Sequence, residues 1–189
     1  MANLFDTLQA GAQRAGITAR TKESKNWFRK KVNQLGDIRP REILKDEALD
    51  PASNQIAGSM YMYFYDPKHK KTLPYYDKFP MVIMVEPAPG GFYGLNLHYL
   101  SPAVRARFLD ALMDTAPKKI TDKSRLKLRY DLLQSTKKFK EFEPCFKHYL
   151  TNHIKGKPVR VPMSEWEIAI FLPVEQFKKV KKETVWRYS

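Results

Sequence analysis

Lysine and arginine side chains beside aromatic residues are the groups in this sequence best suited to binding a polyanion. Cations neutralise phosphates, while aromatic rings stack on bases or anchor an element to the protein body. Three such clusters occur, within residues 27–31, 137–140 and 178–187. They predict nucleic-acid contacts from ten cations: Arg29, Lys30, Lys31, Lys137, Lys138, Lys140, Lys178, Lys179, Lys181 and Lys182. The alternative for any one cluster is a solvated helix face whose aromatic residue points into the core.

Cys145, His148 and His153 have the only spacing that resembles a metal site. On a helix, the first two would share a face and His153 would lie on another side, with no fourth ligand nearby. We therefore expect no structural metal. A single cysteine also excludes an intramolecular disulfide and fits a reducing compartment.

Enzyme chemistry has weaker candidates. Asp66, Asp77 and Glu86 flank predicted strand ends and would suit a Mg²⁺-dependent nuclease, although the two aspartates stand where turn residues are common. Asn96 and His98 lie on the polar side of a predicted strand, and we interpret them as hydrogen-bonding groups that hold a corner against the 66–78 segment. The sequence has no phosphate-binding glycine loop, no convincing carboxylate cluster and no identifiable partner for a catalytic His98, so we expect no cofactor and no catalysis.

Charge is distributed unevenly along the chain. Lys and Arg number 34 against 20 Asp and Glu, a formal charge of +14. Residues 47–115 carry six basic and seven acidic side chains, whereas residues 116–141 carry nine and three. A summed positive field concentrates polyanions whatever the fold. No apolar run approaches the roughly 20 residues that cross a bilayer, and the N-terminus does not resemble a secretory signal.

The nearly neutral, aromatic stretch at residues 60–100 predicts a β-rich core. Residues 59–65 place tyrosines on one face and Met or Phe on the other, the pattern of a strand that is covered on both faces or bears a stacking surface. Further strands are predicted at 79–85 and 92–99, with a turn at 87–91. Together they predict an antiparallel meander or a small, partly open barrel.

Helices are expected to pack against this sheet. Ser101 and Pro102 form a helix start, and the 101–115 helix should leave Arg105 and Arg107 outside. We predict a strand at 125–132 leading into a helix, with a wholly helical alternative, then helices at 143–154 and 164–172 and a short strand at 159–161. Residues 1–50 are interpreted as a basic helical arm and linker, and residues 51–189 as one α+β domain with a basic tail.

Four segments resemble a small protein family of T-even-type tailed phages: YFYDPKHKKTLPYYDKFPMVI, GFYGLNLHYLSPAVRARFLDALM, EPCFKHYLTNHI and EWEIAIFLP. They recur in order over residues 59–177. The matching positions are Asp66, Pro67, Leu73, Pro74, Asp77, Phe79, Pro80, Gly94, Leu95, Asn96, His98, Tyr99 and Leu100, while Tyr76 stands in place of Trp and Ser101 in place of Pro.

Members of that family are described as DNA end protectors or virion structural proteins. The resemblance implies a non-enzymatic virion protein that associates with genome DNA, at its end, through sequence-independent phosphate contacts. It would act in the host cytoplasm during assembly and then in the virion, where it could be oligomeric. The alternatives are a tail, neck or baseplate subunit whose basic segments bind neighbouring proteins, and thirdly the metal-dependent nuclease.

Overall fold

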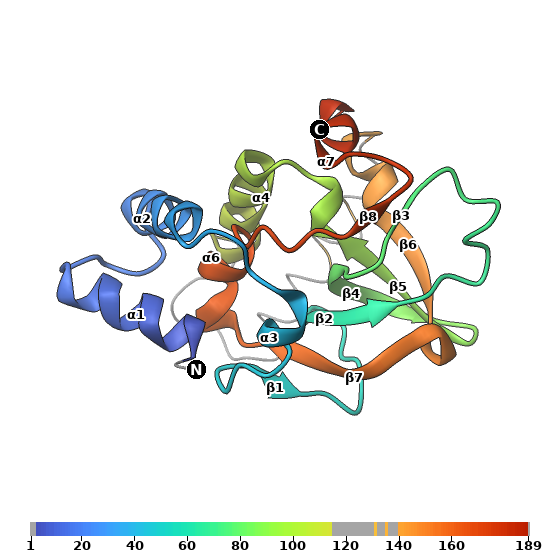
Figure 1. Cartoon of the computed structure of the whole chain (residues 1–189), viewed down its shortest axis with the longest axis horizontal. Coiled ribbons are helices and arrows are strands. Elements are labelled where there is room, and N and C mark those ends of the chain that lie inside the picture. Colours follow the sequence, from blue (N-terminus) through green and yellow to red (C-terminus); the bar gives the residue numbers. More distant parts are fainter. Residues whose placement is uncertain (1–2, 115–130, 132–134, 136–139, 189) are drawn as a thin grey trace.

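The protein is built on an open, six-stranded antiparallel sheet with helices gathered along one side (Figure 1). The computed structural model describes residues 3–114, 131, 135 and 140–188. The strand order is β1-β7-β2-β4-β5-β6, so β1 and β6 are the two edges and the sheet does not close into a barrel. The predicted α+β class is confirmed, and a meander of β2, β4, β5 and β6 is present.

The strands of the main sheet are short. They are β1 (Asp50–Pro51), β2 (Met60–Tyr65), β4 (Met81–Ala88), β5 (Gly91–Asn96), β6 (Phe146–Leu150) and β7 (Ile154–Val161). A separate two-stranded sheet joins β3 (Tyr76–Asp77) to β8 (Phe177–Lys178), which brings the C-terminal segment beside the loop that follows β2.

The helices divide into longer and shorter ones. The longer helices are α1 (Leu4–Arg14), α2 (Lys22–Gln34) and α4 (Pro102–Asp114). The shorter helices are α3 (Pro40–Ile43), α6 (Trp166–Ala169) and α7 (Lys182–Val185). The 3₁₀ turns are η1 (Leu97–Tyr99), η2 (Lys140–Cys145), η3 (Thr151–His153), η4 (Met163–Glu165) and η5 (Trp186–Tyr188).

Strand β2 is covered on both faces, as its two-sided apolar pattern predicts. Met60 and Met62 enter the main core with the helices, while the tyrosines on the opposite face enter a second core cluster. That second cluster is made from strand residues and includes Phe92 and Tyr149. Register shifts between Met62 and Phe64 and between Met84 and Glu86 mark β-bulges, which bend and twist a sheet.

Although residues 1–50 are predicted to form a basic arm and linker, the helices within them belong to the main core. Phe5 and Val32 are fully buried and Phe28 is 1% exposed, because α1 and α2 each present an apolar stripe to the body. The division of the chain at residue 50 stays a prediction.

Buried carboxylates fix these helices in place. Asp46 accepts a hydrogen bond from the backbone N–H of Leu4 at 2.7 Å, where it satisfies a free donor at the start of α1. Glu167 of α6 accepts the Ser24 hydroxyl at 2.8 Å and the Arg20 N–H at 3.0 Å. An ion pair between Lys25 and Asp110 joins α2 to α4.

The helix predicted at 143–154 is wrong. The chain there forms η2, β6, η3 and the start of β7, and β6 pairs with β5 along the sheet edge from Leu95↔Phe146 to Gly91↔Leu150. Pro144 interrupts regular helix hydrogen bonding, and pairing with β5 overrides the weak helical periodicity.

Other predicted boundaries differ from the structure. The strand expected at 92–99 ends at Asn96, whose side chain accepts the His98 N–H and caps η1. The helix expected at 164–172 is reduced to α6 after the η4 turn, and Ser164 caps neither element. The helix at 101–115 is confirmed, with Arg107 exposed, but Arg105 is fully buried. The predicted strand at 125–132 lies almost entirely outside the described residues.

Candidate nucleic-acid interface

The first predicted cluster lies on α2, with its cations in solvent. Arg29, Lys30 and Lys31 are exposed, and the Lys31 ammonium lies 5.6 Å from the centroid of the Trp27 ring. Phe28, unlike the three cations, is buried in the main core. The aromatic residues therefore anchor the helix while the three cations are available to an anionic partner.

The C-terminal cluster is divided between surface and structural roles. Lys178 and Lys181 are exposed. The Lys179 ammonium donates to the carbonyls of Lys70, Lys71 and Leu73 at 2.8, 3.1 and 2.8 Å, so it holds the loop after β2 in place.

The end of the chain is fixed in a similar way. Lys182 lies 3.8 Å from a Glu175 carboxylate oxygen and 5.4 Å from the centroid of Trp186. The Trp186 indole donates to the His98 carbonyl at 2.8 Å. The basic tail is therefore attached to the body through both of these side chains.

The remaining cluster cannot be placed on the surface. Lys137 and Lys138 lie outside the described residues, and only the backbone of Lys140, at the start of η2, is described. The two clusters that are placed do not meet, because α2 lies at one end of the view in Figure 1 and β8 and α7 lie well away from it.

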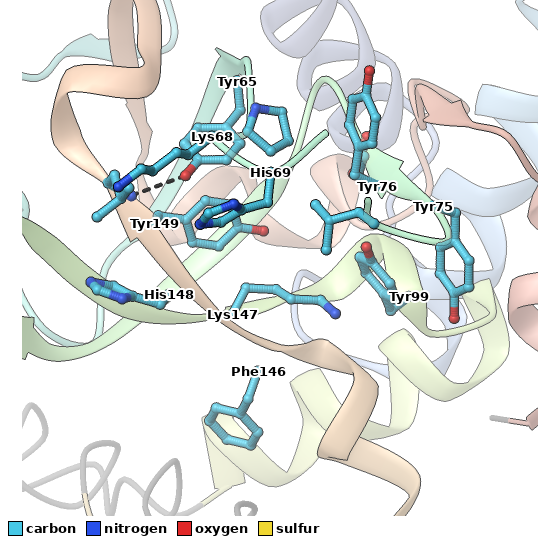
Figure 2. A pocket seen from close by; sticks show the side chains of 14 residues that line it. Tyr65, Lys68, His69, Tyr75, Tyr76, Tyr99, Phe146, Lys147, His148 and Tyr149 are labelled. Atoms are coloured by element: carbon cyan, nitrogen blue, oxygen red, sulfur yellow. Dashed lines mark hydrogen bonds between the residues drawn. The ribbon is translucent and has the colours of Figure 1, made fainter. Parts of the chain in front are cut away.

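A pocket that the sequence did not predict lies between the 66–76 loop and β6 (Figure 2). Its volume is about 410 Å³, within the roughly 300–1,000 Å³ range of small-ligand sites. Its lining combines aromatic rings with basic side chains. The principal members are Tyr65, Tyr75, Tyr76, Tyr99, Phe146 and Tyr149 among the rings, and Lys68, His69, Lys147 and His148 among the bases.

Lys147 is the cation most enclosed by this pocket. Its ammonium lies 4.6 Å from the centroid of the Tyr99 ring, and Figure 2 shows the side chain reaching from β6 toward that ring. Burial lowers the pKa of the Lys147 ammonium, and no carboxylate in the described part of the chain pairs with it. Burial also raises the pKa of the neighbouring Cys145 thiol to about 12, so the thiol is neutral.

The polar wall behind the pocket is a buried hydrogen-bond network centred on Asp77. One of its carboxylate oxygens accepts from Asn96 at 3.1 Å and lies 2.7 Å from His98 Nδ1. The other accepts the backbone N–H groups of Phe79 and Gln176 at 3.0 and 3.1 Å. This confirms that Asn96 and His98 hold the corner against the 66–78 segment.

The network also sets the ionisation of Asp77. Burial alone would raise the pKa of this carboxyl, but the charge of His98 and the donors around it outweigh burial and lower the pKa. His98 is fully buried, which suits a structural group rather than one that meets a substrate.

Arg105 links this corner to the C-terminal segment. Its guanidinium donates to Glu175 at 2.6 Å and to the carbonyls of Leu97, Leu100 and Ile170. Burial opposes ionisation of Glu175, yet the Arg105 charge lowers the pKa of this carboxyl. The sequence predicts Arg105 in solvent, but it is buried because its guanidinium satisfies carbonyls at either end of η1 and after α6.

The residues considered for a metal site and for a nuclease site make other contacts. His148 contacts the Pro89 carbonyl at 3.0 Å and His153 the Asp66 carbonyl at 2.7 Å. Asp66 pairs with Lys70 at 2.8 Å. The antiparallel register of β2 and β4 places Glu86 at the opposite end of the sheet from Asp66. Within the ranges that the structure describes, no three His, Cys, Asp or Glu side chains gather in a metal-binding group.

The pocket escaped sequence reasoning for two reasons. The DPKHKK run lies inside a segment whose total charge is near zero, so the segment's charge count does not reveal this local cluster of cations. Lys147 and Tyr149 alternate with Phe146 and His148, which is a strand pattern. The helical spacing of the same segment favours the helix predicted at 143–154 instead.

A family model described as the phage T4 terminal DNA protecting protein matches residues 1–188. No curated protein and no solved structure matches the chain. None of the described helices is long and apolar enough to span a membrane.

Proposed function

This chain belongs to the phage T4 terminal DNA protecting protein family, and from that membership we propose that it binds the ends of linear phage DNA and shields them from exonucleases. The family match carries the proposal, since it extends over residues 1–188 and so includes the basic helices as well as the sheet.

The charge of the protein supports a contact that does not depend on base sequence. The formal charge is +14, and exposed cations occur on α2, on β8 and in the 66–71 loop. Such cations contact phosphates, which are the same for every sequence. The helices α1, α2 and α4 are each packed into the main core rather than presented as projecting recognition helices.

The protein would act without catalysis, first in the host cell during assembly and then in the virion. Asp77 has four hydrogen-bond donors around its carboxylate, and Asp66 is paired with Lys70, so neither is arranged to hold a metal ion. The bound protein would then protect the DNA because it covers the terminus at which an exonuclease begins digestion.

The test is exonuclease digestion of linear duplex DNA with increasing protein. We expect dose-dependent slowing that is equal for unrelated sequences, and no nicking of circular DNA in the presence of Mg²⁺. Digestion at the unprotected rate, with the protein co-purifying with tail or neck components in high salt, would instead favour an assembly role for the basic segments.

A further inference from the structure

We propose that the pocket between the 66–76 loop and β6 holds the terminal nucleotide of a DNA strand, with its terminal phosphate on Lys147. This inference rests on the proposed function and assigns it a site. Figure 2 shows the arrangement: Lys147 reaches toward Tyr99 in the pocket, while Lys68 and His148 lie on its other side. A strand entering past Lys68 and His148 would end at Lys147.

The size of the pocket favours a single terminal unit. A volume of about 410 Å³ accommodates one small-ligand-sized group, not a length of polynucleotide. Proteins that follow a strand internally use open basic grooves in which successive bases stack on aromatic rings. A pocket of this small volume favours an end, because an internal nucleotide would need the chain to continue out of it on both sides.

The charge of the pocket favours a phosphate monoester. Lys147 is half-buried beside the Tyr99 ring and pairs with no carboxylate among the residues the structure describes. A desolvated cation without a counterion is stabilised by an arriving anion. A terminal monoester carries about 1.5–2 negative charges near pH 7 and three strong acceptor oxygens, more than an internal diester.

The one carboxylate in the lining does not oppose this assignment. Asp77 accepts from four groups, including His98 and Asn96, so its negative charge is met within the wall of the pocket. The half-buried rings of Tyr75 and Tyr76 provide faces for a base, which any of the four bases can use. The site would therefore accept an end without reading its sequence.

The loop that forms one wall is held in place before any ligand arrives. Lys179 donates to three carbonyls of the loop, and Tyr76 pairs with Lys178 across the β3–β8 ladder. A wall fixed in this way need not be ordered when the ligand binds, which reduces the cost of association.

Calorimetric titration of the full chain tests the assignment with four probes. These are deoxyadenosine 5′-monophosphate, deoxyadenosine 3′-monophosphate, unphosphorylated deoxyadenosine and inorganic phosphate. We expect one monophosphate to bind about tenfold or more tightly than deoxyadenosine, the effect of one contact with a charged group. The better monophosphate identifies the strand end that enters, and inorganic phosphate should bind more weakly than that nucleotide because it has no base.

Matched variants locate the binding. Lys147→Met keeps the aliphatic stem over Tyr99 and removes the charge, so it should weaken the better monophosphate about tenfold or more and leave deoxyadenosine unchanged. The control is Lys157→Met, an exposed lysine of β7 that does not line the pocket. Thermal melting of both variants checks folding.

The outcomes separate this inference from the proposed function. Equal binding of monophosphate and deoxyadenosine by the wild-type chain, or no binding of either, overturns the pocket assignment. Protection of duplex ends that is as strong in Lys147→Met as in wild type also overturns it, and leaves the proposed function standing. A phosphate-dependent nucleotide site at Lys147 in a protein that fails to slow exonuclease supports the pocket and refutes the protecting function.

Discussion

His98 Nδ1 lies 2.7 Å from Asp77 Oδ2, and this contact joins the η1 turn to β3 in the protein interior. Both side chains are almost completely buried, at 0% and 1% exposed. Asn96 strengthens the contact, since it donates to the same carboxylate oxygen and caps η1 through the His98 N–H. The corner thus aligns the end of β5, the start of α4 and the wall of the pocket.

Replacing His98 by Ala should destabilise the protein by about 1–3 kcal/mol, because it removes a donor from a buried carboxylate. Urea denaturation followed by circular dichroism measures the change. His148→Ala is the matched control, since that imidazole is exposed, contacts a loop carbonyl and lies beside the Tyr93 ring, and its effect should stay within about 0.5 kcal/mol. Equal denaturation midpoints for the two variants would contradict a structural role for His98.

Stability should fall in acid through Asp77. Its pKa is lowered in the folded protein, so the folded state binds fewer protons than the unfolded chain, whose Asp titrates near a pKa of about 3.9. The stabilisation is therefore complete above that pKa and is lost as the pH falls through the lower, folded one. Glu175 adds a contribution of the same sign.

A pH series of urea denaturations checks this contribution. Asp77→Asn should be less stable than wild type at pH 7 and should lose less stability below about pH 4, because Asn does not titrate. If the wild type and the variant lose the same free energy of unfolding as the pH falls, the acid sensitivity belongs to other groups.

Deleting residues 1–34 should unfold the domain rather than release a loose arm. Phe5, Phe28 and Val32 lie in the main core, and burial of each such side chain contributes about 1.5–3 kcal/mol. Their combined loss is comparable with the roughly 5–15 kcal/mol that stabilises a typical domain. A cooperative thermal transition near the wild-type temperature in the truncated protein would show that residues 35–189 fold without the two N-terminal helices.

The sequence predicted the parts of this fold that depend on local pattern. The two-face apolar pattern identified β2, and the Ser-Pro pair identified the start of α4. Partners distant in sequence were harder to predict. The burial of Arg105 depends on carbonyls and a carboxylate up to 70 residues away, and β6 exists because the edge of β5 is available for pairing. The pocket was missed because it needs both that strand and the loop after β2.

Lys178 and Lys179 form a natural pair of variants, being adjacent in sequence but different in contacts. Lys179→Met removes the ammonium that holds three loop carbonyls, so the 66–76 loop should become more accessible to trypsin at its lysines. Lys178→Met removes an exposed charge from the same segment and should leave the cleavage rate unchanged. Equal rates for the two would mean that the loop is held by other contacts.

The last prediction concerns which basic surface meets DNA. If a strand end occupies the pocket, the neighbouring cations should contact the adjoining phosphates, and Lys178 lies opposite Tyr76 in the β3–β8 ladder. Replacing Lys178 and Lys181 by Ala should lower affinity for linear duplex and reduce the slope of log K against log salt by up to about 0.9 for each lost phosphate contact. Replacing Arg29, Lys30 and Lys31 should have a smaller effect, because α2 lies away from that ladder (Figure 1).

Fluorescence anisotropy with internally labelled linear duplex at several salt concentrations gives both quantities, and a covalently closed circle of the same sequence reports binding that needs no end. A larger loss of slope for the α2 variant on linear and circular DNA alike would place the phosphate contacts on the N-terminal helix. The protein would then bind the duplex along its length through α2. The pocket beside β8 could hold a terminus only when α2 is bound to the DNA close to that terminus.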